Sequence, residues 1–125
     1  MNIPEDLLYT AEHEWIREMG QGVFRIGITD YAQDQLGDVV FVELPKEGKT
    51  LSEGDLVAEI ESTKSVGEVY APFPGTVVAV NDAVVQDPSL VNGSPYDDGW
   101  LFDIQIDGGL PEGLLDAAAY RDLTE

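Results

Sequence analysis

Short runs of β-branched and apolar residues, separated by glycine and proline, dominate the hydrophobic pattern of this chain. Runs of this length with turn residues on both sides are typical of β-strands. The pattern predicts six strands, at residues 23–29, 39–44, 56–61, 66–70, 75–80 and 100–106.

Helical patterns are confined to two places. Asp30 is suited to cap a short helix over residues 31–36, which Gly37 would end. A second helix is expected to open near Pro111 and to carry Leu114, Leu115, Ala118 and Leu123 on one helical period. Many short strands with helices only at the margins favour a small sandwich or barrel. At 125 residues, we expect one domain over residues 1–125.

The net charge of the chain narrows the classes of molecule that it could bind. The chain has 25 acidic and six basic residues, a net charge of −19. Such a surface repels phosphate backbones and anionic headgroups, so we expect neither a nucleic acid nor a membrane as partner. No apolar run is long enough to span a membrane, and the first residues do not resemble a signal peptide. With no cysteine, the chain fits a cytoplasmic protein.

Lys64 is the only lysine or arginine between residues 50 and 120. The stretch 61–66 lies between two predicted strands and reads as a hairpin with Lys64 near its tip, and Gly54 and Gly75 flank it at nearly equal spacing. A lysine on a rigid hairpin tip presents its amine in one geometry, which suits covalent modification. The alternative is an ordinary turn lysine paired with Glu61 or Glu68.

Catalytic and metal-binding chemistry is sparse. The single histidine, His13, cannot build a multi-histidine metal site, and beside two glutamates it is expected to have a local hydrogen-bonded role. Three short motifs do not have the sequence context that their usual functions require and are interpreted as turns or loops: Gly20-x-Gly22, Gly48-Lys49-Thr50 and Asn92-Gly93-Ser94. We therefore predict no catalytic residue, no metal site and no intrinsic enzymatic activity.

Several blocks together resemble one family, the H proteins of the glycine cleavage system. The stretch from Gly54 to Val77 around Glu61-Ser62-Thr63-Lys64-Ser65-Val66 is similar to a lipoyl-attachment segment. Further matching blocks are Glu12-His13-Glu14-Trp15, Gly27-Ile28-Thr29-Asp30-Tyr31-Ala32-Gln33-Asp34, Leu36-Gly37-Asp38, Val42-Glu43-Leu44-Pro45, Ser94-Pro95-Tyr96 and Gly99-Trp100-Leu101.

The resemblance implies a mainly β, hybrid barrel-sandwich fold with short peripheral helices, one of them at the C-terminus. It implies a non-catalytic carrier with one lipoic acid joined to Lys64 by an amide. Its partners would be glycine decarboxylase (P protein), aminomethyltransferase (T protein) and dihydrolipoamide dehydrogenase (L protein), which exchange an aminomethyl group and electrons with the arm. Lipoyl or octanoyl transferase and lipoyl synthase would build the arm. Glu14 would lie near the arm as an exposed acid, and Glu68 would be a second shielding acid.

Other assignments are weighed against this one. The chain could act mainly as a lipoate relay to other enzymes, or be a lipoyl domain of a 2-oxo-acid dehydrogenase. A biotin carrier normally has methionine on both sides of its lysine, whereas Thr63 and Ser65 flank Lys64 here. A small acidic enzyme would need the catalytic constellation that is missing. Two departures from the family pattern concern how the arm is held: Gly67-Glu68 after the lysine, and Gln35 where some relatives have histidine.

Overall fold

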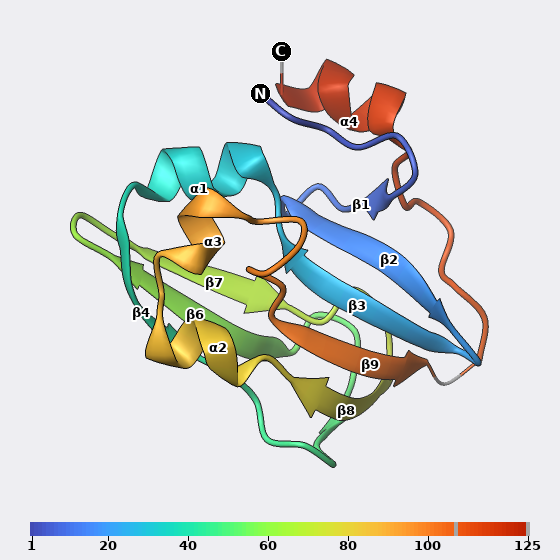
Figure 1. Cartoon of the computed structure of the whole chain (residues 1–125). Helices are drawn as coiled ribbons and strands as arrows, with labels where there is room; N and C mark the ends of the chain where they lie inside the picture. Colours follow the sequence, from blue (N-terminus) through green and yellow to red (C-terminus); the bar gives the residue numbers. More distant parts are fainter. Residues whose placement is uncertain (107, 125) are drawn as a thin grey trace.

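The computed structural model describes residues 1–106 and 108–124. Within these residues the chain forms two antiparallel sheets with short helices around them (Figure 1). The larger sheet has the strand order β1-β2-β3-β9-β8-β5. Its strands are β1 (Leu8–Tyr9), β2 (Glu14–Gly20), β3 (Val23–Ile28), β9 (Phe102–Ile106), β8 (Gly75–Val80) and β5 (Thr50–Leu51).

The smaller sheet has the order β4-β6-β7 and faces the larger one across an apolar core. Its strands are β4 (Val39–Glu43), β6 (Leu56–Ser62) and β7 (Val66–Tyr70). Ile60 of this sheet and Ile26 and Ile104 of the larger sheet are completely buried in the same cluster. The fold is therefore mainly β, a hybrid barrel-sandwich of the kind that the sequence predicted.

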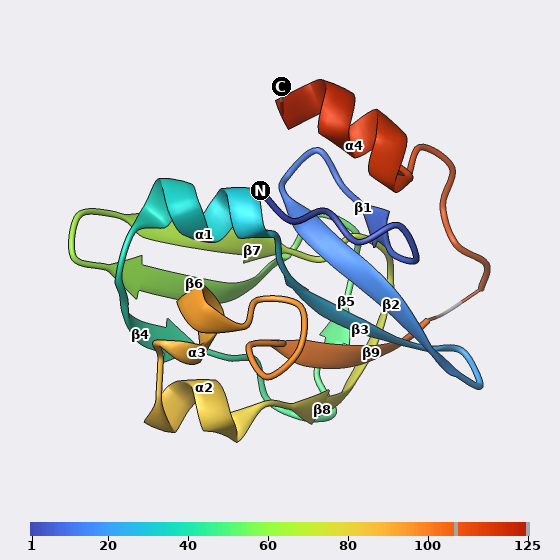
Figure 2. The ribbon, with the colours of Figure 1, turned by 45° about the horizontal axis from the view of Figure 1, so that its top comes forward.

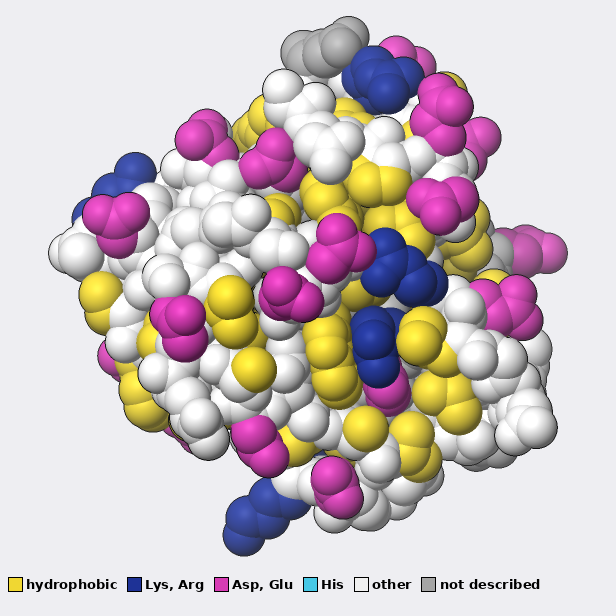
Figure 3. All heavy atoms as spheres, viewed as in Figure 1, with side chains coloured by type: hydrophobic (Ala, Val, Ile, Leu, Met, Phe, Trp, Pro, Cys, Tyr) yellow, Lys and Arg dark blue, Asp and Glu magenta, His cyan; other side chains and the backbone are white. Residues whose placement is uncertain are grey.

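The helices lie at two places on the sheets (Figures 1 and 2). Helices α1 (Asp30–Leu36), α2 (Asp82–Gln86) and α3 (Leu90–Gly93) gather at one end of the molecule. Helix α4 (Ala117–Thr124) packs beside the N-terminal segment and β1, where Tyr9 and Tyr120 stack with ring centroids 4.7 Å apart. Acidic side chains are spread over the face shown in Figure 3, whereas basic ones are few.

All six predicted strands are present, with ends that differ by no more than two residues. Strands β1, β2 and β5 and helices α2 and α3 were not predicted. Three of these five elements have only two to four residues, too few for a hydrophobic period to show. Within the described residues, none of the helices has the length and apolar character needed to cross a membrane.

Both predicted helix starts were wrong. The cap of α1 is Thr29, whose hydroxyl accepts a hydrogen bond from Ala32 N at 3.2 Å, and Asp30 is the first helical residue. Helix α4 begins at Ala117 rather than near Pro111. The reason is that Leu115 makes two backbone hydrogen bonds with Tyr9, both 2.8 Å, which keeps this segment extended at the sheet edge.

We expect Gly27→Ala to lower the free energy of unfolding by about 1–3 kcal/mol. A Cβ atom at Gly27 would lie 2.5 Å from two ring carbons of Trp15. That ring is completely buried, and its Nε1 donates a hydrogen bond to Pro95 O at 2.8 Å, so it cannot move aside without losing the bond. Urea unfolding measures the effect. Gly109→Ala is the control, because nothing lies within 4 Å of a Cβ there, and equal losses in both variants would contradict the prediction.

Candidate functional site

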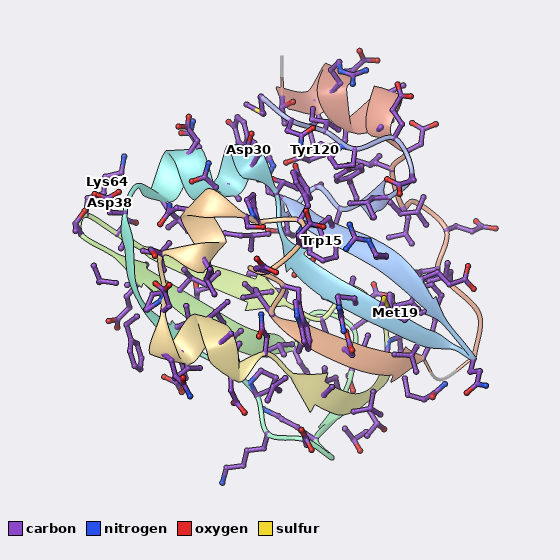
Figure 4. The ribbon with its side chains drawn as sticks, in the orientation of Figure 1. Trp15, Met19, Asp30, Asp38, Lys64 and Tyr120 are labelled. Atoms are coloured by element: carbon purple, nitrogen blue, oxygen red, sulfur yellow. The ribbon has the colours of Figure 1, made fainter. Side chains whose placement is uncertain are left out.

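Lys64 lies in the connection between β6 and β7, as the sequence predicted (Figure 4). The two strands pair in antiparallel register up to Glu61 and Val66, which leaves a short connection centred on Lys64. Lys64 is exposed, so the fold presents its amine to solvent at the end of a rigid hairpin.

The side chain of Ser62 shapes this connection. Its hydroxyl accepts hydrogen bonds from Lys64 N at 3.3 Å and Ser65 N at 3.0 Å, and it donates to Ser65 O at 3.1 Å. The backbone adds a bond from Ser62 N to Ser65 O at 2.8 Å. Serine hydroxyls stabilise turns in this way, and Ser62 was missed as a site residue although a serine two positions before a turn lysine signals such a turn.

The amine of Lys64 forms no ion pair within residues 1–106 and 108–124, where the structure has one such pair, Arg25–Asp103 at 2.9 Å. The alternative that Lys64 is a turn lysine paired with Glu61 or Glu68 therefore does not describe this structure. The carbon chain of Lys64 instead passes Gly37, with Cε 3.3 Å from the position that a Cβ would occupy there. An exposed, unpaired amine on a packed stem fits covalent attachment of a carrier group.

Glu68 is exposed and belongs to a row of acids across the smaller sheet. It lies opposite Glu59 in the β6–β7 register, and Glu59 lies opposite Glu43 in the β4–β6 register. Like charges in such positions destabilise a sheet, so this row favours contact with a cation. Glu68 Oε1 accepts a hydrogen bond from the Tyr70 hydroxyl at 3.1 Å, and this bond is the main reason that the pKa of Tyr70 is raised.

Glu14 is buried, and the expectation of an exposed acid at an edge was wrong: only 2% of it is exposed. Tyr70 N donates to Glu14 Oε2 at 3.0 Å, and Thr10 Oγ1 is 3.1 Å from Glu14 Oε1. Burial raises the pKa of Glu14 to about 8, against the opposing effect of these two hydrogen bonds. This burial has no signature in the sequence, because the contact joins residues 56 positions apart.

A pocket of about 520 Å³ opens beside Glu14. Its wall includes Tyr70, whose backbone contacts Glu14 and whose hydroxyl contacts Glu68. The structure thus connects both predicted shielding acids through one tyrosine, although Glu68 itself is not part of the pocket wall. Four of the residues that line the pocket are glutamates: Glu12, Glu14, Glu53 and Glu112. An acidic pocket of this size at the far end of β7 from Lys64 suits a small cationic group.

His13 has the local hydrogen-bonded role that the sequence predicted. Its Nδ1 is 2.8 Å from the Tyr120 hydroxyl, and that hydroxyl is 2.7 Å from Thr29 Oγ1. Burial lowers the pKa of His13 below its ordinary value. In the described part of the chain, no group of three or more histidine, cysteine, aspartate or glutamate side chains is arranged to hold a metal ion.

The buried Glu14 predicts a pH dependence of stability. Because its pKa in the folded protein lies above the ordinary value of 4.5, the folded state keeps a proton that the unfolded state has lost. The contribution to stability is complete below pH 4.5 and is lost as pH rises through about 8. Glu14→Gln keeps the shape and cannot ionise. We expect it to gain on the order of 3 kcal/mol over the wild type between about pH 5 and about pH 9 in urea unfolding, and parallel profiles would contradict this.

Comparison with known proteins gives consistent matches. The family model described as "Glycine cleavage H-protein" matches residues 7–125. A glycine cleavage system H protein of Micrococcus luteus is 55% identical over 98% of this chain and 98% of the relative. One of Mycobacterium avium is 55% identical over 99% of this chain and 98% of the relative. The crystal structure of a glycine cleavage system H protein from Mycobacterium marinum superposes with a TM-score of 0.88 at 43% identity, covering 96% of this chain and 97% of that one.

Proposed function

Because this chain belongs to the glycine cleavage H-protein family, a family of lipoyl carriers, we propose that its lipoic acid is attached through an amide to Lys64. The observation that carries the proposal is the place of Lys64: an exposed amine at the end of a hairpin, without an ion pair in the described residues. When bound, the lipoyl group supplies a disulfide that takes up a small cargo and two electrons. The protein's own part is to present, shelter and release that group.

Family membership supports a proposal for the cargo and the route. The carrier takes the aminomethyl group of glycine from the pyridoxal-phosphate decarboxylase (P protein) to the folate-dependent aminomethyltransferase (T protein). It then passes reducing equivalents to dihydrolipoamide dehydrogenase (L protein). Lipoyl or octanoyl transferase and lipoyl synthase would install the arm. The chain would work as one carrier domain in the cytoplasm and catalyse no step itself; its two sheets enclose a common core, which supports the single-domain part of this proposal.

Glu68 and Glu14 have separate tasks in this proposal. Glu68 is exposed on β7, four residues after Lys64, and offers a carboxylate beside the path that an arm lying along this strand would take. Glu14 is buried in the wall of the pocket at the Tyr70 end of the strand. The cargo ends in an amine that is cationic at neutral pH, so both acids would attract it while the pocket keeps water away.

The intact mass of the protein from its native cells tests the attachment. We expect one lipoyl or octanoyl group per chain, which peptide mapping places on Lys64. Lys46 and Lys49 are the other two lysines, both exposed, and serve as internal controls for specificity. A biotin mass, or a lipoyl group on Lys46 or Lys49, would overturn the proposal.

A further inference from the structure

The hairpin that carries Lys64 rests on residues 36–39, where the end of α1 connects to the start of β4. Thr63 N donates a hydrogen bond to Asp38 O at 3.0 Å, and the carbon chain of Lys64 passes Gly37. Figure 4 shows Lys64 and Asp38 together at this end of the molecule. Leu36 covers β7 so closely that its methyl carbons lie 3.1 Å from the position of a Cβ at Gly67. The place of Lys64 therefore depends on the place of this connection.

One side chain from a distant part of the chain holds the connection. Asn92 in α3 accepts a hydrogen bond from Val39 N at 2.8 Å through its Oδ1. Its Nδ2 donates to Gly37 O at 2.9 Å and to the side chain of Gln33 at 3.0 Å. These bonds tie down the backbone on both sides of Asp38, the residue that accepts the bond from Thr63.

The position of Asn92 is itself fixed by contacts within its helix and with the core. Its own backbone N donates to Ser89 O at 3.1 Å within the short helix α3, and the neighbouring Val91 is completely buried. Both Nδ2 hydrogens are engaged, and the residue is only partly exposed. The Asn92-Gly93-Ser94 motif is therefore not a free polar turn as the sequence suggested, and a glycan on Nδ2 would break the bonds described above.

We propose that Asn92 is a positioning residue for the modified lysine: by fixing residues 37–39 it holds the hairpin end, and with it Lys64, in one place for the enzymes that modify and use it. This rests on the proposed function of Lys64 as the attachment site. An amide is suited to the task because it supplies both a donor for the Gly37 carbonyl and an acceptor for the Val39 N–H. Alanine would leave both backbone groups without their partner.

The chain offers a matched control in Asn81. Its Nδ2 also donates to two backbone carbonyls, those of Asp98 at 2.8 Å and Trp100 at 2.7 Å, and its Oδ1 accepts from Ala83 N at 3.2 Å. Asn81 thus makes three side-chain hydrogen bonds, as Asn92 does, but they go to a segment other than the lysine hairpin and its support. One difference is that one of the Asn92 bonds goes to the side chain of Gln33 rather than to the backbone. Asn92→Ala and Asn81→Ala are expected to lose comparable stability, so stability alone cannot explain a difference between them in modification.

The test measures lipoylation of the unmodified protein by a lipoate ligase with lipoate and ATP, followed by intact mass. We expect Asn92→Ala to lower kcat/KM for this reaction about tenfold, since small displacements of a reacting group are costly, and Asn81→Ala to leave it within about twofold. Hydrogen exchange supplies the second measurement. The amide protons of Thr63 and Val39 should lose protection in Asn92→Ala and keep it in Asn81→Ala.

Asn92→Asp keeps the acceptor for Val39 N but places a carboxylate against the Gly37 carbonyl. It should fall below wild type as well, and it serves if the alanine variant does not fold. Modification at the wild-type rate in a folded Asn92 variant, or an equal loss in Asn81→Ala, would overturn the inference. Failure of the proposed function would be visible separately, because the wild type itself would then not be modified at Lys64.

Discussion

Lys64→Arg should abolish glycine decarboxylation and exchange in a reconstituted system, with a loss of at least about a hundredfold, while the protein folds normally. Arginine keeps the positive charge and cannot form the amide that joins the carrier group. Its carbon stem is long enough to pass Gly37 as the lysine stem does, and the side chain is exposed, so the free energy of unfolding should change by less than about 0.5 kcal/mol.

The measurement combines intact mass, urea unfolding and the rate of CO₂ exchange with the decarboxylase. Lys49→Arg is the matched control, because Lys49 is also exposed and lies away from the β6–β7 hairpin. It should be lipoylated and active like the wild type. Activity of Lys64→Arg near the wild-type level would refute the carrier role of Lys64. Unfolding of this variant would contradict the expectation that the Lys64 side chain contributes little to the stability of the fold.

The sequence predicted the features that arise from local pattern. The segments on both sides of Lys64 are rich in β-branched residues and are bounded by glycines, so β6 and β7 could be placed closely. The isolation of Lys64 among acids drew attention to the hairpin between them. The mainly β class followed from the same pattern, whereas the hybrid barrel-sandwich form was implied by the resemblance to the family. Features of this kind depend only on residues that are neighbours in the sequence, and they can therefore be predicted from it.

The features that sequence could not predict depend on contacts between distant segments. Glu14 stands between other polar residues and looks solvated, yet Tyr70 and Thr10 enclose it. Asn92 belongs to a four-residue helix without a hydrophobic period, and its role is visible only where it meets Gly37. In each case the sequence shows the residue type but not the partner that gives it a function.

Burial of Glu14 changes the experiment that can test its role in sheltering the cargo. An alanine there would open a cavity and leave Tyr70 N without its partner, so a loss of function could come from damage to the fold. Glu14→Gln keeps the hydrogen-bonding shape. With a pKa of about 8, the acid of the empty protein is itself mostly uncharged at neutral pH, so the glutamine closely imitates it. At neutral pH the folded forms of the two proteins should therefore differ in their attraction for a cation, apart from the difference in stability described above.

The two acids lie at different distances from Lys64 along β7. Along an extended strand, Glu68 lies about 13 Å from Lys64, and Tyr70, whose backbone N–H contacts Glu14, lies about 20 Å away. A cargo amine that moves along the strand therefore meets Glu68 first, and it meets Glu14 only when the arm lies along the strand toward the pocket. We infer that Glu14 marks the end of the sheltered path and that Glu68 marks its middle.

We expect Glu14→Gln to shorten the lifetime of the aminomethyl-loaded protein about tenfold to a hundredfold, because a charge-assisted hydrogen bond in a sheltered site contributes about 1.5–3 kcal/mol. The difference from wild type should grow as pH rises toward 8, where Glu14 gives up its proton more easily. It should depend little on salt, since buried pairs are poorly screened. Glu68→Gln, at an exposed position, should have a smaller and salt-sensitive effect. Release of formaldehyde and ammonia from the isolated loaded protein measures both, and equal release from wild type and Glu14→Gln at every pH would remove Glu14 from the sheltering site.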